Sequence, residues 1–202
     1  YLVMEYAPDG SLKDALSGRG AHPLASPVEV SLAVEIVSQI ASALQYTHDR
    51  GVVHGDVKPG NVLVEMEPDG HRRMLLADYG VARDLEATAQ ISMVTGTVAY
   101  MAPEQFSGGF SPASDQYALA VVAYQLLAGH PPFEGGFAEQ MRGHLDLTPP
   151  PLRGANPAVP RSVEAVIRRA LAKEPRARYP SVLAFADALE LALRPEAENT
   201  VF

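Results

Sequence analysis

The strongest helical pattern in the chain lies between Pro27 and Arg50. Apolar residues recur there at intervals of three and four, the spacing that places side chains on one face of an α-helix. These residues are Ile36, Val37, Ile40 and Leu44. The pattern predicts a helix with one buried face, and Gly51 follows as a candidate C-cap.

A second helical stretch is apolar on nearly every side. Residues 115–128 read DQYALAVVAYQLLA, which is typical of a helix buried in the middle of a domain. Residues 148–160 are rich in proline and predict a loop. Residues 162–172 and 180–193 predict two closing helices.

Strand-forming residues gather in two places. Residues 1–6, YLVMEY, predict a strand that the following APDG ends. Two short apolar runs then flank the turn residues at positions 68–70, which predicts a β-hairpin. The two ends of this hairpin carry Asn61 and Asp78, so we expect these side chains to converge.

Composition narrows the class of protein. The 202 residues and 21.6 kDa fit one domain with a real core. The net charge of -8 leaves no basic field, so we expect no binding to nucleic acid. The chain has no cysteine and no apolar run of membrane-spanning length, so we expect a cytoplasmic location without membrane contact inside this chain.

The stretch HGDVKPGN, residues 54–61, contains several residues that can take part in catalysis or bind a metal ion. Phosphoryl transfer needs a base for the attacking hydroxyl, a cation for the phosphate oxygens and oxygen ligands for Mg²⁺. Asp56 can be the base and Lys58 the cation, while Asn61 and Asp78 supply the oxygens. The alternative is a plain turn, because Asp, Asn, Gly and Pro dominate turns.

Motifs further along the chain decide between these interpretations. Together with the loop they resemble a eukaryotic-like (Hanks-type) bacterial serine/threonine protein kinase, from the hinge through the C-terminal lobe. The motifs are DYG at 78–80, GTVAYMAPE at 96–104, SDQYALA at 114–120 and RARYPS at 176–181. The resemblance implies an α+β kinase-like fold with a mostly helical C-terminal lobe and small β-hairpins. Its expected parts are a hinge strand and linker at 1–10, the lobe at 11–194 and a frayed tail at 195–202.

The resemblance also implies roles for the loop residues. Asp56 would be the catalytic base, and Asn61 and Asp78 would bind magnesium. Lys58 is the lysine typical of Ser/Thr specificity. Thr97 would hydrogen-bond to Asp56 and Lys58 and shape the acceptor site.

Other residues are implied to be structural. Glu104 would pair with Arg178, and Asp115 would tie its buried helix to the catalytic loop. We also expect a structural role for His54. For an ion pair such as Glu104–Arg178, a structural role is the usual one.

The resemblance places ATP against the hinge. The backbone of Glu5 and Ala7 would bind the adenine edge, with Met4 at the back of the pocket. Leu63 would pack beneath the ring and Ser11 would lie near the ribose. The alternative for Met4 and Leu63 is an ordinary core position.

Two positions depart from the family's pattern. Gly55 stands where the family has an arginine that meets a phosphate on the activation segment, so switching through that contact is in doubt. The candidate phosphosites on this segment are Thr88, Ser92 and Thr95. Tyr79 replaces the phenylalanine of the DFG motif and adds a hydroxyl that needs a partner.

Two other functions compete. Aminoglycoside-type small-molecule phosphotransferases carry H-G-D-x-x-x-x-N, as this chain does, but they lack the segment ending in A-P-E and the lysine at position 58. A non-catalytic, pseudokinase-like binding module is the second alternative. The glycine-rich loop and the strand lysine of a kinase are missing, because the three lysines are Lys13, Lys58 and Lys173 and none follows a strand pattern.

We therefore interpret the chain as a kinase fragment without the N-terminal lobe. The complete protein is expected to transfer the γ-phosphate of Mg-ATP to Ser or Thr of protein substrates, itself included. The 202-residue chain alone is expected to be inactive. Kinases of this kind often continue into a membrane anchor, which here would follow Phe202.

Overall fold

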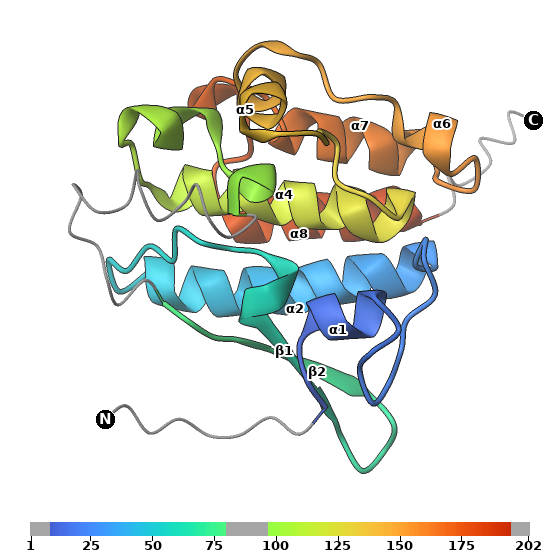
Figure 1. The fold of residues 1–202 in the computed structure, drawn as a ribbon. Coiled ribbons are helices and arrows are strands. Elements are labelled where there is room, and N and C mark those ends of the chain that lie inside the picture. Colours follow the sequence, from blue (N-terminus) through green and yellow to red (C-terminus); the bar gives the residue numbers. More distant parts are fainter. Residues whose placement is uncertain (1–8, 80–96, 195–202) are drawn as a thin grey trace, which may run out of the picture.

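Two long helices form the centre of the described structure, with a β-hairpin on one side and shorter helices on the other (Figure 1). The computed structural model describes residues 9–79 and 97–194. The predicted strand at 1–6 lies outside these residues. The helices are α1 (Leu12–Leu16), α2 (Val30–His48), α4 (Pro112–Ala128), α5 (Phe137–Asp146), α6 (Leu152–Ala155), α7 (Arg161–Ala170) and α8 (Val182–Leu193). The strands are β1 (Val62–Met66) and β2 (Arg72–Leu76), and the 3₁₀ turns are η1 (Pro59–Asn61), η2 (Thr97–Tyr100), η3 (Pro103–Ser107) and η4 (Pro175–Ala177).

Helix α2 is the amphipathic helix that the sequence predicts. Its four periodic apolar residues are buried, and the carboxylate of Glu29 accepts hydrogen bonds from the first free amides of the helix. The chain leaves the helix through Asp49, and Gly51 then adopts a φ of +73°, which favours glycine. The predicted helix is confirmed within a few residues at each end.

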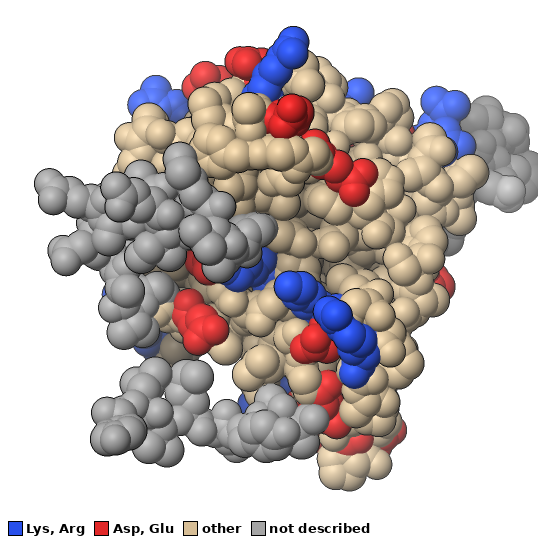
Figure 2. Space-filling model, viewed as in Figure 1, with Lys and Arg blue, Asp and Glu red and all other residues tan. Residues whose placement is uncertain are grey.

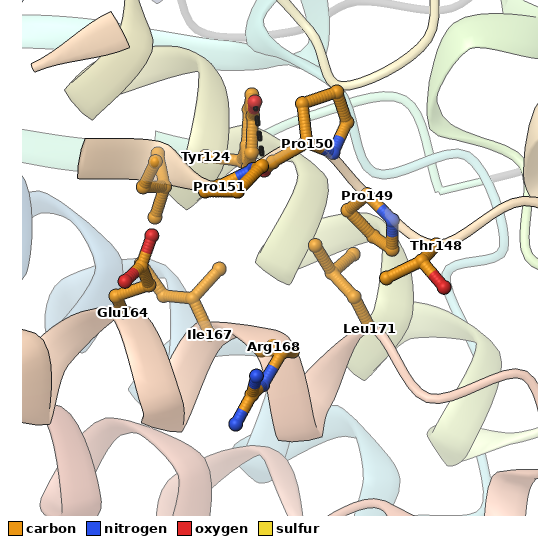
Figure 3. A pocket seen from close by; sticks show the side chains of 10 residues that line it. Tyr124, Thr148, Pro149, Pro150, Pro151, Glu164, Ile167, Arg168 and Leu171 are labelled. Carbon is orange, nitrogen blue, oxygen red and sulfur yellow. Dashed lines mark hydrogen bonds between the residues drawn. The ribbon is translucent and has the colours of Figure 1, made fainter. Parts of the chain in front are cut away.

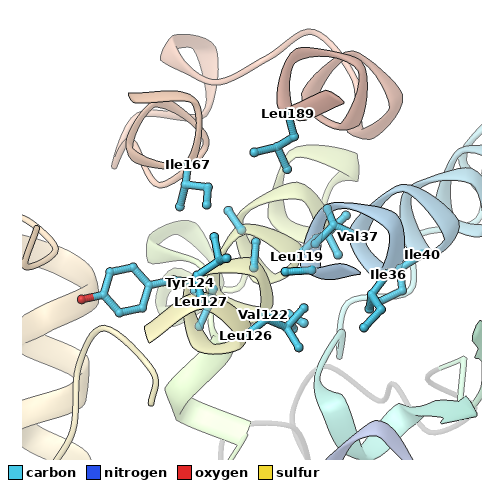
Figure 4. Packing of buried hydrophobic residues seen from close by; sticks show 14 of the residues in the cluster. Ile36, Val37, Ile40, Leu119, Val122, Tyr124, Leu126, Leu127, Ile167 and Leu189 are labelled. Carbon is cyan, nitrogen blue, oxygen red and sulfur yellow. The ribbon is translucent and has the colours of Figure 1, made fainter. Parts of the chain in front are cut away.

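Helix α4 is buried on nearly all sides, as its composition predicts. It begins with Pro112 in the first turn and ends at Gly129, which has a φ of +87°. Figure 4 shows its leucine and valine side chains between Ile36 and Ile40 of α2 on one side and Ile167 of α7 and Leu189 of α8 on another. The helix is therefore the axis around which the other elements pack.

The predicted hairpin is also present. Strands β1 and β2 are antiparallel, with Val62 opposite Leu76. Gln39 of α2 ties the hairpin to the helix, because its side chain donates to the Arg72 carbonyl at 2.9 Å and accepts from the Met74 amide at 2.8 Å. This packing fixes where the open end of the hairpin lies.

Several short helices differ from the sequence predictions. The predicted loop at 148–160 contains the single turn α6, and α1 and α5 were not predicted at all. Helix α5 contains Gly143, which lowers its helical signal. The structure explains this glycine, since a Cβ there would lie 2.4 Å from the Phe133 ring. In the part of the chain that the structure describes, no helix is long and apolar enough to cross a membrane.

Candidate active site

The loop between α2 and η1 is anchored to the first turn of α4. Asp115 is fully buried, and its two carboxylate oxygens accept hydrogen bonds from the backbone amides of His54 at 2.8 Å and Gly55 at 2.6 Å. The imidazole of His48 lies 2.8 Å from the same carboxylate. The structure thus joins Asp115 to the loop through two backbone hydrogen bonds, and it adds His48 as a partner of the carboxylate.

Both the backbone amide and the backbone carbonyl of Gly55 are hydrogen-bonded. Its carbonyl accepts a hydrogen bond of 3.0 Å from the Gln105 side chain, whose oxygen in turn accepts from the Ala102 amide at 2.8 Å. Its φ of +69° lies in the left-handed region that favours glycine. Sequence reasoning missed Gln105, because nothing in the sequence relates it to a residue fifty positions away.

His54 connects the loop to the end of the hairpin. Its Nδ1 accepts from the Asp56 amide at 3.2 Å, so the proton of the neutral ring sits on Nε2, which donates to the Ala77 carbonyl at 2.9 Å. The ring of Tyr79 packs against His54 with centroids 4.6 Å apart. The Tyr79 hydroxyl finds its partner in Thr47, and burial raises the pKa of Tyr79.

Asp56, Lys58 and Asn61 form the chemical centre of the loop. The Oδ2 atom of Asp56 accepts hydrogen bonds from Lys58 Nζ at 2.8 Å and from Asn61 Nδ2 at 3.0 Å. Asn61 Nδ2 also donates to the Asp56 carbonyl at 2.8 Å, which fixes the carboxylate relative to its own backbone. The other oxygen, Asp56 Oδ1, is buried and has no hydrogen-bond partner in the described structure. A buried acceptor in this state is costly, so Oδ1 requires a donor that the described residues do not supply.

Asn61 and Asp78 lie together at the open end of the hairpin. The amide of Ala77 donates to the Asn61 carbonyl at 2.9 Å, which brings the next residue, Asp78, beside the loop. Asp78 is exposed and has a φ of +57°, rare for a residue other than glycine. The Asn61 side-chain nitrogen is engaged by Asp56, so its oxygen is the atom that can serve as a ligand. One amide oxygen and one carboxylate, completed by water and phosphate, fit the ligand preference of Mg²⁺.

The residues expected around the adenine are only partly described. Ser11 and Leu63 are bridged to each other as antiparallel neighbours, and Leu63 is half-buried. The Ser11 hydroxyl also caps α1, because it accepts from the Asp14 amide at 3.2 Å. The remaining sequence-predicted positions outside the described residues are Met4, Glu5, Ala7, Thr88, Ser92, Thr95 and the side chain of Thr97.

Glu104 and Arg178 form a bidentate ion pair in which the arginine is buried and the glutamate is partly buried. The Arg178 side chain is 0% exposed, and its two terminal nitrogens lie 2.7 Å and 2.8 Å from the Glu104 oxygens. Arg178 also donates to the carbonyls of Ala113 and Ala172, and Ser114 donates to Glu104. Burial alone would raise the pKa of Glu104, but the bonded guanidinium reverses this and the pKa lies below its ordinary value. The pair joins η3 to the chain after α7.

Among the cavities on the described surface are two that lie at different distances from these residues. One, of about 380 Å³, lies between α4, α6 and α7 and is walled by Tyr124, Pro150, Ile167 and Leu171 (Figure 3). No residue of the loop or the hairpin lines it. The other, of about 290 Å³, opens directly beside Lys58. The second borders the candidate active site through Lys58, as does a much smaller hollow lined by Asp56.

Comparison with known proteins gives the family. Residues 1–188 match the family model described as protein kinase domain. The chain is 40% identical over 198 residues to the serine/threonine-protein kinase Pkn1 of Myxococcus xanthus, covering 96% of this chain and 27% of that protein. It is 37% identical over 183 residues to the serine/threonine-protein kinase PrkC of Bacillus subtilis, covering 89% of this chain and 27% of that protein.

Solved structures agree with this result. The crystal structure of the Mycobacterium tuberculosis PknI kinase domain matches with a TM-score of 0.70 at 32% identity, over 94% of this chain and 64% of that one. The chain belongs to the protein kinase family and has the kinase fold, as the sequence resemblance predicts. It spans about a quarter of the length of the curated relatives Pkn1 and PrkC. Family membership favours a protein kinase over the small-molecule phosphotransferase alternative.

Proposed function

We propose that the complete protein is a serine/threonine protein kinase with Asp56 as its catalytic base. The observation that carries this proposal is the unpartnered Oδ1 of Asp56. Its companion oxygen is bonded to Lys58 and Asn61, so the carboxylate is oriented while Oδ1 lacks a donor among the described residues. A hydroxyl that donates to Oδ1 would lie next to the Lys58 ammonium, where a transferred phosphoryl group needs positive charge.

The reaction assigns a task to each residue. The acceptor hydroxyl donates to Asp56 Oδ1, its oxygen attacks the γ-phosphorus of ATP, and the bond to the oxygen bridging the β- and γ-phosphorus breaks. Asp56 takes the proton, and Lys58 neutralises charge on the transferred group. Asn61 and Asp78 would hold Mg²⁺, which when bound neutralises phosphate oxygens. Asn61 also keeps Asp56 in position through its amide nitrogen.

The substrate class follows from the relatives and the chain's own motifs. The relatives Pkn1 and PrkC are both named as serine/threonine-protein kinases. We propose that the acceptors of the complete protein are Ser or Thr in proteins, and that the protein phosphorylates itself on Thr88, Ser92 or Thr95. We also propose that Ser11 and Leu63 border the ATP site, where they lie side by side, and that this part of the protein is cytoplasmic.

The substitution Asp56→Asn in the complete protein tests the proposal. Loss of a positioned general base lowers kcat by about 100-fold or more, while ATP binding should change little. Asp187→Asn, on the exposed side of α8, is the matched control and should keep full activity. If Asp56→Asn kept most of the activity, the assignment of the base would be wrong. If the unaltered protein bound nucleotide and transferred no phosphate, the non-catalytic alternative would hold instead.

A further inference from the structure

The cavity beside Lys58 lies where the flank of an acceptor sequence must pass. It is formed by α1, η1, η2 and the end of α4, and its walls include Lys13, Gly60, Tyr100 and Gln125. Lys58 lines the cavity and bonds Asp56 at the same time. A chain that brings its hydroxyl to Asp56 therefore lays its neighbouring residues over this cavity.

The charge of this cavity is opposite to that of the chain as a whole. The chain carries a net charge of -8, yet the charged side chains among the described lining residues are both lysines, Lys13 and Lys58. Arg19 adds a third positive charge beside it, since it donates to the lining residue Ser17 at 3.1 Å. Figure 2 shows positive side chains in a short row over α1 and the loop next to it.

The nearest acidic side chain on α1 is engaged elsewhere. The Asp14 carboxylate accepts hydrogen bonds from the backbone amide and the hydroxyl of Ser11. These bonds lower the pKa of Asp14, and the nearby charges of Arg19 and Lys13 lower it further, but the hydrogen bonds of the carboxylate go to Ser11 at the start of α1. Asp14 is absent from the described lining of the cavity.

Lys13 is placed to meet a charge from outside the chain. It is exposed and forms no ion pair with any residue that the structure describes. Its aliphatic stem runs past Gly60, where a Cβ would lie 4.0 Å from Lys13 Cδ, so the absence of a side chain at Gly60 leaves this space open. The hydrogen bond of 2.7 Å from Tyr100 to Gln125 fixes the opposite wall.

We propose that this cavity selects acceptor sequences that carry an anionic side chain, a carboxylate or a phosphate, a few residues from the Ser or Thr. Lys13 is the residue that determines this specificity, and Arg19 reinforces it. The proposal rests on the proposed kinase function, because it concerns the substrate of the same site. A single exposed charge pair of this kind changes kcat/KM by roughly 2- to 5-fold, and reversal of the lysine charge by about 10-fold.

The test uses the complete protein and a set of alanine-based peptides with one serine acceptor. Glu, Ala, Lys or phosphoserine is placed in turn at each of four positions on either side of the acceptor, and kcat/KM is measured. We expect Glu and phosphoserine to exceed Ala, and Ala to exceed Lys, on one flank. The ratio of kcat/KM for the Glu peptide to kcat/KM for the Ala peptide should decrease at high ionic strength, because exposed charges are screened. If kcat/KM for the phosphoserine peptide exceeds that for the Glu peptide by more than the extra charge explains, phosphate is the preferred anion. Equal kcat/KM values for the Glu, Ala and Lys peptides would overturn the proposal.

Charge reversal at Lys13 makes the test specific. Lys13→Glu should invert the order, so that kcat/KM is higher for Lys peptides than for Glu peptides. Lys13→Ala should make kcat/KM nearly equal for the two. Arg161→Glu makes the same charge change at the exposed start of α7 and should preserve the order. A Lys13→Glu protein that still prefers Glu peptides would refute the role of Lys13. If the unaltered protein phosphorylates the all-alanine peptide without charge preference, only this inference fails; if it phosphorylates no peptide, the proposed function fails with it.

Discussion

The Asp115 carboxylate and the Gly55 backbone amide are joined by a hydrogen bond of 2.6 Å across sixty positions of sequence. The same carboxylate bonds the His54 amide, and its side chain is 0% exposed. A buried carboxylate is stable only when donors satisfy both its oxygens. Asp115 therefore fixes the backbone of the loop at residues 54–61 from the interior of the domain.

Asp115→Asn should weaken both the fold and the activity. An amide has one acceptor oxygen in place of two, so it turns an N–H toward at least one of the donors that now bond Asp115. We expect a loss of about 1–3 kcal/mol in the free energy of unfolding, measured with urea, and a lower kcat. Asp187→Asn on the surface of α8 should change stability by less than about 0.5 kcal/mol. Equal effects of the two substitutions would show that Asp115 does not support the loop.

The ion pair of Glu104 and Arg178 should behave unlike an exposed pair. Arg178→Met leaves the Glu104 carboxylate without its guanidinium partner. We therefore expect the free energy of unfolding to fall by about 3–5 kcal/mol. The exposed pair of Arg73 and Glu65, 3.4 Å apart, is the control, and Arg73→Met should cost less than about 1 kcal/mol.

Urea unfolding of single and double variants separates the pair from its surroundings. The double variant Glu104→Gln with Arg178→Met should be less destabilised than the sum of its single variants, because the second change removes a group already left unpaired. Additive single effects would mean that the two side chains act independently, contrary to their hydrogen bonds.

Gly55 makes a prediction about regulation. Its amide and carbonyl are both bonded inside the domain, and it has no side chain to meet a phosphate. We therefore expect that phosphorylation of Thr88, Ser92 or Thr95 activates the complete protein little. Phosphatase treatment, checked by mass spectrometry, should leave most of the kinase activity. Loss of activity after dephosphorylation would mean that another group takes the place of the missing arginine.

The long elements could be predicted from the sequence because their signals are local. The apolar positions of α2 repeat along one face, and the hairpin turns at Gly70, which has a φ of +89°. Helix α5 could not be predicted, since its Gly143 is explained only by the Phe133 ring packed against it.

The candidate site likewise contains a part that the sequence predicts and contacts that it does not predict. The loop from His54 to Asn61 is recognisable as a short motif, because its chemistry is contiguous in sequence. The contact of Gln105 with Gly55 joins residues fifty positions apart and that of His48 with Asp115 joins residues sixty-seven apart. Neither contact leaves a spacing signal, so tertiary structure was needed to find them.

His144 should make the domain less stable in mild acid. The side chain is fully buried, its Nδ1 lies 3.0 Å from the Tyr117 hydroxyl, and burial together with the nearby Lys173 ammonium lowers its pKa from 6.5 to about 4. The unfolded chain binds a proton below about pH 6.5 and the folded domain only near pH 4, so stability falls as the pH drops through this window. A shift of this size corresponds to about 3 kcal/mol.

His144→Gln keeps an acceptor for Tyr117 but cannot titrate. Between pH 7 and pH 4, the free energy of unfolding measured with urea should therefore fall by about 3 kcal/mol more for the unaltered domain than for the variant. Parallel stability curves for the two proteins would show that His144 is not the group responsible.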